Sequence, residues 1–395
     1  MKTFKTNNKN FYKKLKVILA ARSQNNIPKV DEKVKKIISE VRLKGDEALF
    51  NFAKKFDKSN INASNILISK KIIKSYKKKI NPSIMKAFNI AIKNVKNFHK
   101  KQKPKNFKIT KEGSMIESIW KPIESVGLYI PGGKSVYPSS LIMNVIPAQI
   151  AGVKRIVVVT PTNFNEINPY ILALLDKLSI DEMYQVGGAH AIAALAYGTK
   201  SIKPVNKIFG PGNSYVASAK KQVFGKVGID LIAGPSEIIV VADKFNNPDW
   251  VASDLLAQAE HDENAQSILI TDDINFSKKV FSSIEKLSMN LSKQKTIKKS
   301  LDNFGLVVLV DDFNQTSEII NFIAPEHLHL HLQTKLSNKI LKNVINAGAI
   351  FIGEYTPEAF GDYIIGTNHI LPTSGSAKFS SGLGVLDFMK RSSIV

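Results

Sequence analysis

The feature that most constrains the fold is an alternation of short β-branched runs with apolar helical stretches, which begins near Val126. The predicted strands are Val126–Ile130, Arg155–Thr160, Glu182–Val186, Lys207–Phe209 and Glu237–Ala242, followed by Ser267–Thr271, Leu306–Val310 and Ala349–Gly353. The predicted helices are Leu141–Ala151, Pro169–Leu178, Ala189–Ala196, 249–260 and 275–291. Such alternation is typical of βαβ units, whose strands form parallel sheets. The sequence therefore predicts an α/β fold with two Rossmann-like parallel-sheet domains.

The region before this alternation is helical and rich in lysine. Apolar residues at helical spacing predict a helix over 28–57 with Gly45 as a stop, and a second helical pair over 66–103, ending near Pro104. Residues 1–111 hold 31 basic and 6 acidic side chains, whereas the rest of the chain holds 25 and 27. The net charge of +23 therefore comes from the first quarter of the chain.

This positive charge raises the question of a nucleic-acid partner. Only four of the 56 basic residues are Arg, the side chain that makes bidentate contacts to bases, and no aromatic ladder interleaves the lysines. We therefore interpret the lysines as a solvated face and predict no nucleic-acid partner.

The complete absence of cysteine narrows the chemistry. It excludes disulfides, thiolate zinc sites, cysteine-held iron–sulfur clusters and a cysteine nucleophile. No segment approaches the ~18 apolar residues that span a membrane, and the run Val17–Ala21 is shorter than the ~7–15 residues of a signal sequence. We expect a cytoplasmic protein with no membrane partner.

Three glycine-rich turns follow predicted strands: Gly127–Gly133, Gly187–His190 and Gly210–Asn213. Glycines there allow close approach of a phosphate and leave the N–H groups of the next helix free. The chain contains no complete GxGxxG and no Walker motif. The turns predict a ligand-binding rim at the strand ends of one domain.

Two polar groupings could carry the chemistry. Gln258 and His261 lie three residues apart on a predicted helix, a spacing compatible with a shared metal and equally with ordinary surface polarity. Glu326 stands beside His327, a carboxylate–imidazole pair suited to acid–base catalysis.

The segment after this pair, 328–332, alternates Leu with His. It resembles a metal-binding strip, but a half-exposed edge strand is the better interpretation for His329 and His331. Asp362 lies in a predicted loop that contains several glycines. Its carboxylate could be functional or could simply stabilise a turn, and the sequence is compatible with both interpretations.

Taken together, the strings GLYIPGG, GPGN, AGPSE, LLAQAEHD, APEHL and GDYIIGTNHILPT resemble the L-histidinol dehydrogenase family, from about Val41 to the end of the chain. The resemblance implies a homodimer that uses one Zn²⁺ per subunit and NAD to oxidise L-histidinol through L-histidinal to L-histidine, the last steps of histidine biosynthesis. Related zinc- and NAD-dependent dehydrogenases for another small amino alcohol or diol, or a truncated and impaired homologue, are the alternatives.

The resemblance also implies residue roles. Gln258, His261 and Asp362 would bind zinc, and Glu326 and His327 would form the acid–base pair. Ser236 would contact the substrate, as would Gln258, His261, His327 and Asp362. The cofactor contacts would be Tyr129, Asn213 and His190, which stands where the family has Gln in its GGAQ loop. Without cysteine no thiohemiacetal can form, so a hydrated aldehyde is the coherent route to the acid.

We predict four parts of the chain. An N-terminal arm covers 1–22, and a last segment covers 379–395. Between them, a first α/β domain over 23–124 plus 238–378 contains the zinc and acid–base residues, and a second α/β domain over 125–237 lies on the cofactor side. Family members usually continue into a small helical C-terminal domain with a fourth zinc ligand and a substrate-contacting Glu. The resemblance therefore implies three protein zinc ligands here, with weaker histidinol binding and a weaker dimer.

Overall fold

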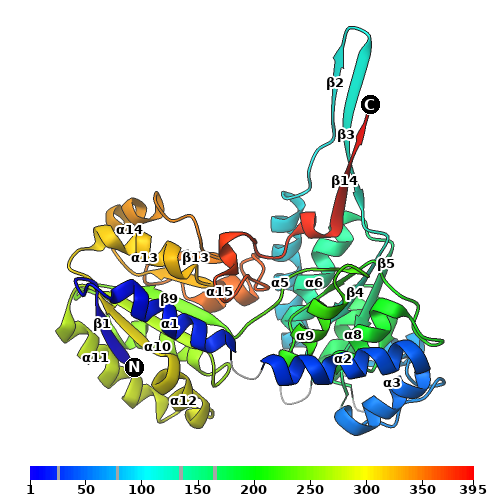
Figure 1. Cartoon of the computed structure of the whole chain (residues 1–395), viewed down its shortest axis with the longest axis horizontal. Helices are drawn as coiled ribbons and strands as arrows, with labels where there is room; N and C mark the ends of the chain where they lie inside the picture. Colours follow the sequence, from blue (N-terminus) through cyan, green and yellow to red (C-terminus); the bar gives the residue numbers. More distant parts are fainter. Residues whose placement is uncertain (25–26, 77–79, 133–136, 163–166) are drawn as a thin grey trace. The chain divides into compact units, whose positions relative to one another are not determined.

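The computed structural model describes residues 1–24, 27–76, 80–132, 137–162 and 167–395 (Figure 1). The chain forms two compact units. Unit 1 comprises Met1–Asn25, Ala233–Gly361 and Leu371–Gly382, and unit 2 comprises Asn26–Ile232, Asp362–Ile370 and Leu383–Val395. Over the described ranges, no helix is long and apolar enough to cross a membrane.

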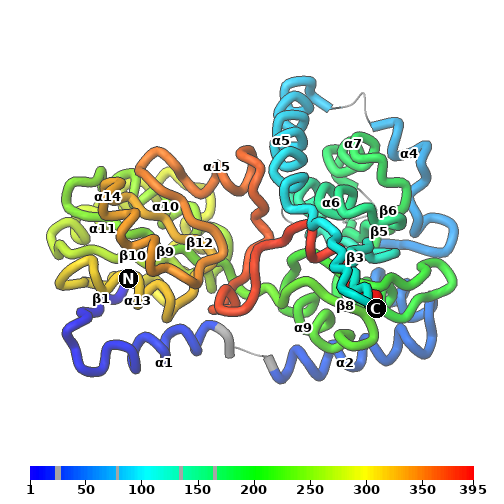
Figure 2. The backbone as a smooth tube through the Cα atoms, turned by 90° about the horizontal axis from the view of Figure 1, so that it is seen from above, coloured from blue at the N-terminus to red at the C-terminus, as the bar shows by residue number. Residues whose placement is uncertain are grey.

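The described part of unit 1 is built on a six-stranded parallel sheet in the order β1-β11-β10-β9-β12-β13. Its strands are β1 (Lys2–Lys5), β9 (Glu237–Val241), β10 (Gln266–Thr271), β11 (Leu306–Leu309), β12 (His327–Leu330) and β13 (Ala349–Ile352). Figure 2 shows β9, β10 and β12 side by side in this unit. The central strands are buried on both faces, as expected for parallel sheets covered by helices.

Helices cover both faces of this sheet. Ile238 and Val240 of β9 pack with α10 (Pro248–Ala259), α11 (Ile274–Ser288) and α12 (Gln294–Phe304). Ile239 and Val241 pack with α1 (Phe11–Gln24), α13 (Thr316–Ile323) and α14 (Thr334–Leu341). A short helix α15 (Glu358–Tyr363) follows β13, and single 3₁₀ turns lie at Phe313–Gln315 and Ser376–Lys378. Alternate residues of β9 therefore pack into two separate apolar cores, one on each face of the sheet.

The described part of unit 2 holds a five-stranded parallel sheet in the order β6-β5-β4-β7-β8. The strands are β4 (Ser125–Tyr129), β5 (Arg155–Val159), β6 (Glu182–Tyr184), β7 (Lys207–Phe209) and β8 (Gly228–Ile229). One core joins the sheet to α2 (Ile27–Lys44), α3 (Asp46–Phe52), α8 (Gly188–Tyr197) and α9 (Ser214–Val223). The other joins it to α4 (Lys70–Ser75), α5 (Pro82–Lys100), α6 (Pro138–Ala151), α7 (Pro169–Lys177) and the 3₁₀ turn Val385–Phe388.

A three-stranded antiparallel ribbon extends from unit 2 (Figure 1). Its order is β14-β3-β2, with β2 at Phe107–Lys111, β3 at Ser114–Pro122 and β14 at Met389–Ile394. Every residue of β2 is exposed. The sequence analysis did not predict this ribbon, because its alternation of Lys with single apolar residues resembles a solvated loop.

The predicted strands and helices of the alternating region are confirmed, with ends that match or differ by at most three residues. The predicted helix 28–57 is wrong in detail: Gly45, at a φ of 59°, separates α2 from α3, and a π-helical turn follows at Ala53–Asp57. The edge-strand prediction for His329 is also wrong. β12 lies between β9 and β13, and all of its residues are buried.

The predicted domain boundaries differ from the observed units. Residues 1–22 are not an arm, because β1 pairs with β11 and α1 packs on the sheet of unit 1. Residues 26–124 belong to unit 2 rather than to the unit that contains 238–361. The reason is long-range packing, since α2 packs in the same core as α8 and α9. Local sequence patterns carry no signal for that choice.

Candidate functional site

Glu326 and His327 lie at the amino end of β12, in unit 1. The sheet reverses its strand order between β9 and β12, so this pair stands at the topological switch point, but at the end opposite to the usual ligand crevice. Glu326 is 6% exposed and His327 3% exposed. The backbone N–H of Glu237, the first residue of β9, donates a hydrogen bond of 3.0 Å to Glu326 Oε2.

Burial dominates the electrostatics of this pair. Desolvation raises the pKa of Glu326 from 4.5 to about 8, against the lowering effects of His327 and of the Glu237 N–H. The Nδ1 atom of His327 lies 3.7 Å from Glu326 Oε2 and 3.9 Å from Glu358 Oε2. A carboxyl group that titrates near neutral pH beside an imidazole is suited to proton transfer.

A buried arginine lies behind Glu237. Arg22, from α1, donates hydrogen bonds of 2.5 Å to Glu237 Oε2, 2.8 Å to Gln266 Oε1 and 2.7 Å to the Pro235 carbonyl oxygen. The other Glu237 oxygen accepts from the backbone N–H of Ser374 at 2.7 Å. Sequence reasoning missed Arg22 and Glu237. One signal existed, because Arg22 is one of only four arginines in a chain that otherwise uses lysine.

Gln258 and His261 differ in their surroundings. Gln258, in the last turn of α10, is 0% exposed, and among the described residues neither of its amide atoms has a hydrogen-bond partner. The helix ends at Ala259, so His261 lies in the following turn and is exposed, whereas the sequence placed both residues on one helix. Its N–H still donates to the Gln258 carbonyl oxygen at 3.2 Å.

A buried amide group without a hydrogen-bond partner destabilises the folded state unless a bound ligand interacts with it. An amide oxygen, an imidazole and a carboxylate are all donors that zinc accepts. Gln258, His261 and Asp362 therefore fit a zinc ion by their chemistry. Asp362 lies four residues after Glu358 in α15, so the two carboxylates share one face of that helix. Sequence reasoning missed the buried Glu358. Ser236, half-buried, immediately precedes β9.

The three predicted cofactor residues all belong to unit 2. Its sheet reverses strand order between β4 and β7, where Tyr129 ends one strand and the turn with Asn213 follows the other. The two segments touch closely: a Cβ on Gly210, at a φ of +106°, would come 2.1 Å from the Tyr129 carbonyl oxygen. Such a switch point is where dinucleotides bind in doubly wound sheets. Gly133, which ends the first glycine turn, lies outside the described residues.

Near this switch point, side chains accept hydrogen bonds from backbone N–H groups in the first turns of α8 and α9. The hydroxyl of Tyr129 accepts from the Gly188 N–H at 3.2 Å, and burial raises the pKa of Tyr129 to about 12. Asn213 is exposed, and its side-chain oxygen accepts hydrogen bonds from the backbone N–H groups of Tyr215 and Val216 in the first turn of α9. These residues fix the loops that a cofactor would contact.

His190 is buried in α8, and its Nε2 lies 3.2 Å from Asp57 Oδ2. The same oxygen accepts from the Gly187 N–H at 3.0 Å. Sequence reasoning missed Asp57, which ends the π-helical turn. His190 is thus engaged by a carboxylate of its own unit.

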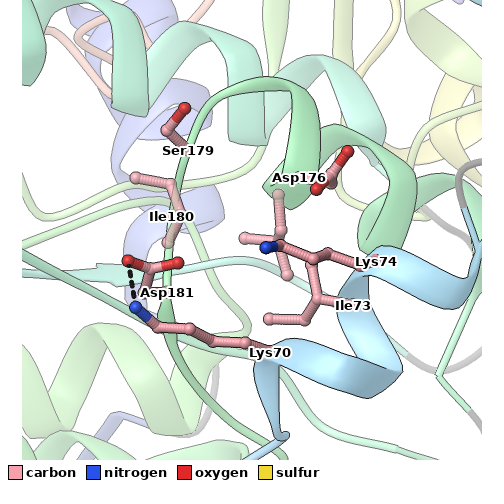
Figure 3. A pocket seen from close by; sticks show the side chains of 8 residues that line it. Lys70, Ile73, Lys74, Asp176, Ser179, Ile180 and Asp181 are labelled. Atoms are coloured by element: carbon pink, nitrogen blue, oxygen red, sulfur yellow. Dashed lines mark hydrogen bonds and ion pairs between the residues drawn. The ribbon is translucent and has the colours of Figure 1, made fainter.

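The cavity in Figure 3 lies elsewhere in unit 2, between α4 and the turn after α7. An exposed ion pair of Lys70 with Asp181, at 2.7 Å, stands at its edge. None of the predicted site residues lines it.

Comparisons with known proteins identify the family of this chain. The sequence profile of the histidinol dehydrogenase family matches residues 20–395. A histidinol dehydrogenase of Mesorhizobium japonicum is 49% identical over 367 residues, which are 93% of this chain and 85% of the relative. One of Rhodospirillum rubrum is 48% identical over 379 residues, 95% of this chain and 87% of the relative.

A solved structure supports the same conclusion. The crystal structure of histidinol dehydrogenase from Elizabethkingia anophelis superimposes with a TM-score of 0.92 and 34% identity, over 100% of this chain and 90% of that one. The profile match, the identities and the fold together show that the chain belongs to the histidinol dehydrogenase family.

Proposed function

We propose that this protein oxidises L-histidinol to L-histidine with NAD as the electron acceptor, in the last steps of histidine biosynthesis. The observation that carries the proposal is the buried Glu326–His327 pair, whose carboxyl pKa of about 8 suits proton transfer at neutral pH. Membership of the histidinol dehydrogenase family supports the substrate and the acceptor.

In the first oxidation a proton leaves the substrate hydroxyl as hydride leaves the adjacent carbon. Two NAD molecules, bound in turn, would supply the acceptors: one for this hydride and one for the hydride of the hydrated aldehyde. His327 accepts the hydroxyl proton on its imidazole and passes it to solvent. While His327 holds that proton, its positive charge lowers the pKa of Glu326 and favours the ionised form of the carboxyl group.

The second oxidation needs water added to the aldehyde carbon. The ionised carboxylate of Glu326 removes a proton from that water, and His327 accepts the proton of the resulting diol as the second hydride leaves. The acid is then released without a covalent enzyme intermediate, in agreement with a chain that has no cysteine.

We propose that Gln258, His261 and Asp362 hold one Zn²⁺. The unpartnered buried amide of Gln258 supports this assignment. When bound, the ion would orient the substrate and polarise its oxygen. Ser236 and His327 would contact the substrate beside it.

We propose that NAD contacts Tyr129, His190 and Asn213. The support is their position around the glycine turns of unit 2, two of them at its strand-order reversal. We further propose that the protein acts as a homodimer in the cytoplasm. Sedimentation velocity over a range of protein concentrations tests the dimer.

The test of the function is to measure NADH formed per L-histidinol, with zinc present and after chelation. We expect two NADH per histidinol, loss of turnover after chelation and recovery when zinc is restored. Release of one NADH with accumulation of aldehyde would overturn the role of Glu326. Turnover of other amino alcohols, with none of histidinol, would overturn the substrate.

A further inference from the structure

A second cluster of potential metal ligands lies in unit 1, apart from the residues discussed above. It comprises Asp254 of α10, His329 of β12 and His331, which follows β12 directly. All three are buried, and each offers a ligand atom within 4.8 Å of the other two. His327 and His329 are two residues apart in β12 and therefore point to the same sheet face. The cluster continues that face toward the carboxyl end of the strand.

The contacts within the cluster are short. Asp254 Oδ2 lies 2.8 Å from His329 Nδ1 and 2.7 Å from His331 Nε2. One carboxylate oxygen is thus shared by two imidazoles, whose ring centroids are 4.0 Å apart. The three potential ligand atoms therefore converge on one buried point of unit 1.

The two ring nitrogens of His329 have different neighbours. Its Nε2 lies 3.0 Å from the carbonyl oxygen of Gly353, which can only accept a hydrogen bond, so Nε2 carries the proton. Its Nδ1 lies 2.8 Å from Asp254 Oδ2 without a hydrogen bond of suitable geometry between them. So close an approach of a ring nitrogen and a carboxylate oxygen is held by a proton or by a cation between the two atoms.

A metal ion is a cation that these ligand atoms could hold. Ligating histidines in proteins commonly donate their other ring N–H to a backbone carbonyl, which is the arrangement of His329 and Gly353. Two imidazole nitrogens and a carboxylate oxygen suit a divalent transition metal, bound at about 2.0–2.2 Å from each. The three atoms need to separate only slightly to admit it.

We propose that Asp254, His329 and His331 bind a second divalent transition-metal ion, with Zn²⁺ as the representative probe. Asp254 lies one helical turn before Gln258 in α10, so the ion would tie this helix to the carboxyl end of β12. With every ligand buried, its role would be structural, and any remaining coordination position would be filled by water. The site does not depend on the proposed catalytic zinc.

The test is the zinc content of the full chain after equilibration with Zn²⁺ and removal of free metal, measured by elemental analysis. We expect the variant His329→Asn/His331→Asn to hold one zinc equivalent fewer than the unaltered protein. This difference holds whether or not the catalytic zinc exists, so the two proposals fail separately. His99→Asn, another buried histidine, is the matched control and should hold as much zinc as the unaltered protein.

Equal zinc content in the double variant and the unaltered protein would overturn the proposal and leave a hydrogen-bonded triad that shares a proton. If the double variant does not fold, crystals of the unaltered protein grown with Zn²⁺ decide the question. Anomalous scattering at the zinc edge should give a peak between Asp254 and His329. Absence of that peak at saturating Zn²⁺ would equally refute the site.

Discussion

Replacing Arg22 with Met should strongly destabilise unit 1. Arg22 is 6% exposed, and its guanidinium donates hydrogen bonds to Glu237, to Gln266 and to three backbone carbonyl oxygens. The change leaves the Glu237 carboxylate buried with one backbone hydrogen bond, from Ser374. Breaking a buried ion pair from one side costs about 3–5 kcal/mol, so we expect a loss of that order in the free energy of unfolding.

The assay is urea denaturation followed by circular dichroism, with Arg42→Met as the control. Arg42 is exposed and lies 5.4 Å from the ring of Tyr197, a contact that is worth about 0.5–1 kcal/mol. The double variant Arg22→Met/Glu237→Gln should recover part of the loss, because it removes both charges. Equal losses for Arg22→Met and Arg42→Met would refute the importance of the buried pair.

The same variant should also change catalysis. The negative charge of Glu237 raises the pKa of Glu326, and Arg22 balances that charge. Without Arg22 the pKa of Glu326 should rise further, so the pH profile of histidinol oxidation should move to higher pH. A variant that is less stable but has an unchanged profile would limit Arg22 to a structural role.

Three further outcomes follow from the structure. Because the pKa of Glu326 is raised to about 8, the folded state binds more protons than the unfolded state between pH 4.5 and about 8. The free energy of unfolding should therefore fall as the pH rises through that window, by up to about 1.4 kcal/mol per pH unit. Urea titrations at several pH values should show this slope in the unaltered protein and not in Glu326→Gln. Gly210→Ala should lower the yield of folded protein, because its Cβ would come 2.1 Å from the Tyr129 carbonyl oxygen. The control Gly225→Ala lies at a similar φ with open space around it, so it should lower the yield far less. Similar yields of the two variants would contradict the clash. Tyr129→Phe should cost about 1 kcal/mol by removing the acceptor of the Gly188 N–H and should raise the KM for NAD; an unchanged KM would argue against cofactor contact.

Buried polar residues show where sequence reasoning stops. The alternation of Leu with His in 328–332 predicts a strand but also an exposed polar face, and that face is buried. The His side chains are buried because β13 covers one edge of β12 and Asp254 supplies a partner for His329 and His331. The hydropathy of a strand cannot reveal such a partner, because Asp254 comes from another element.

The sequence by itself determined the order of strands and helices, the glycine turns and the adjacency of Glu326 and His327. Apolar periodicity and turn chemistry act between residues close in the chain, and they can be read without a fold. Tertiary structure decided which unit takes 26–124, and the pairing of Arg22 with Glu237 across 215 residues. It also decided the pKa of Glu326. Burial and pairing depend on which distant groups meet, and only the packed chain brings them together.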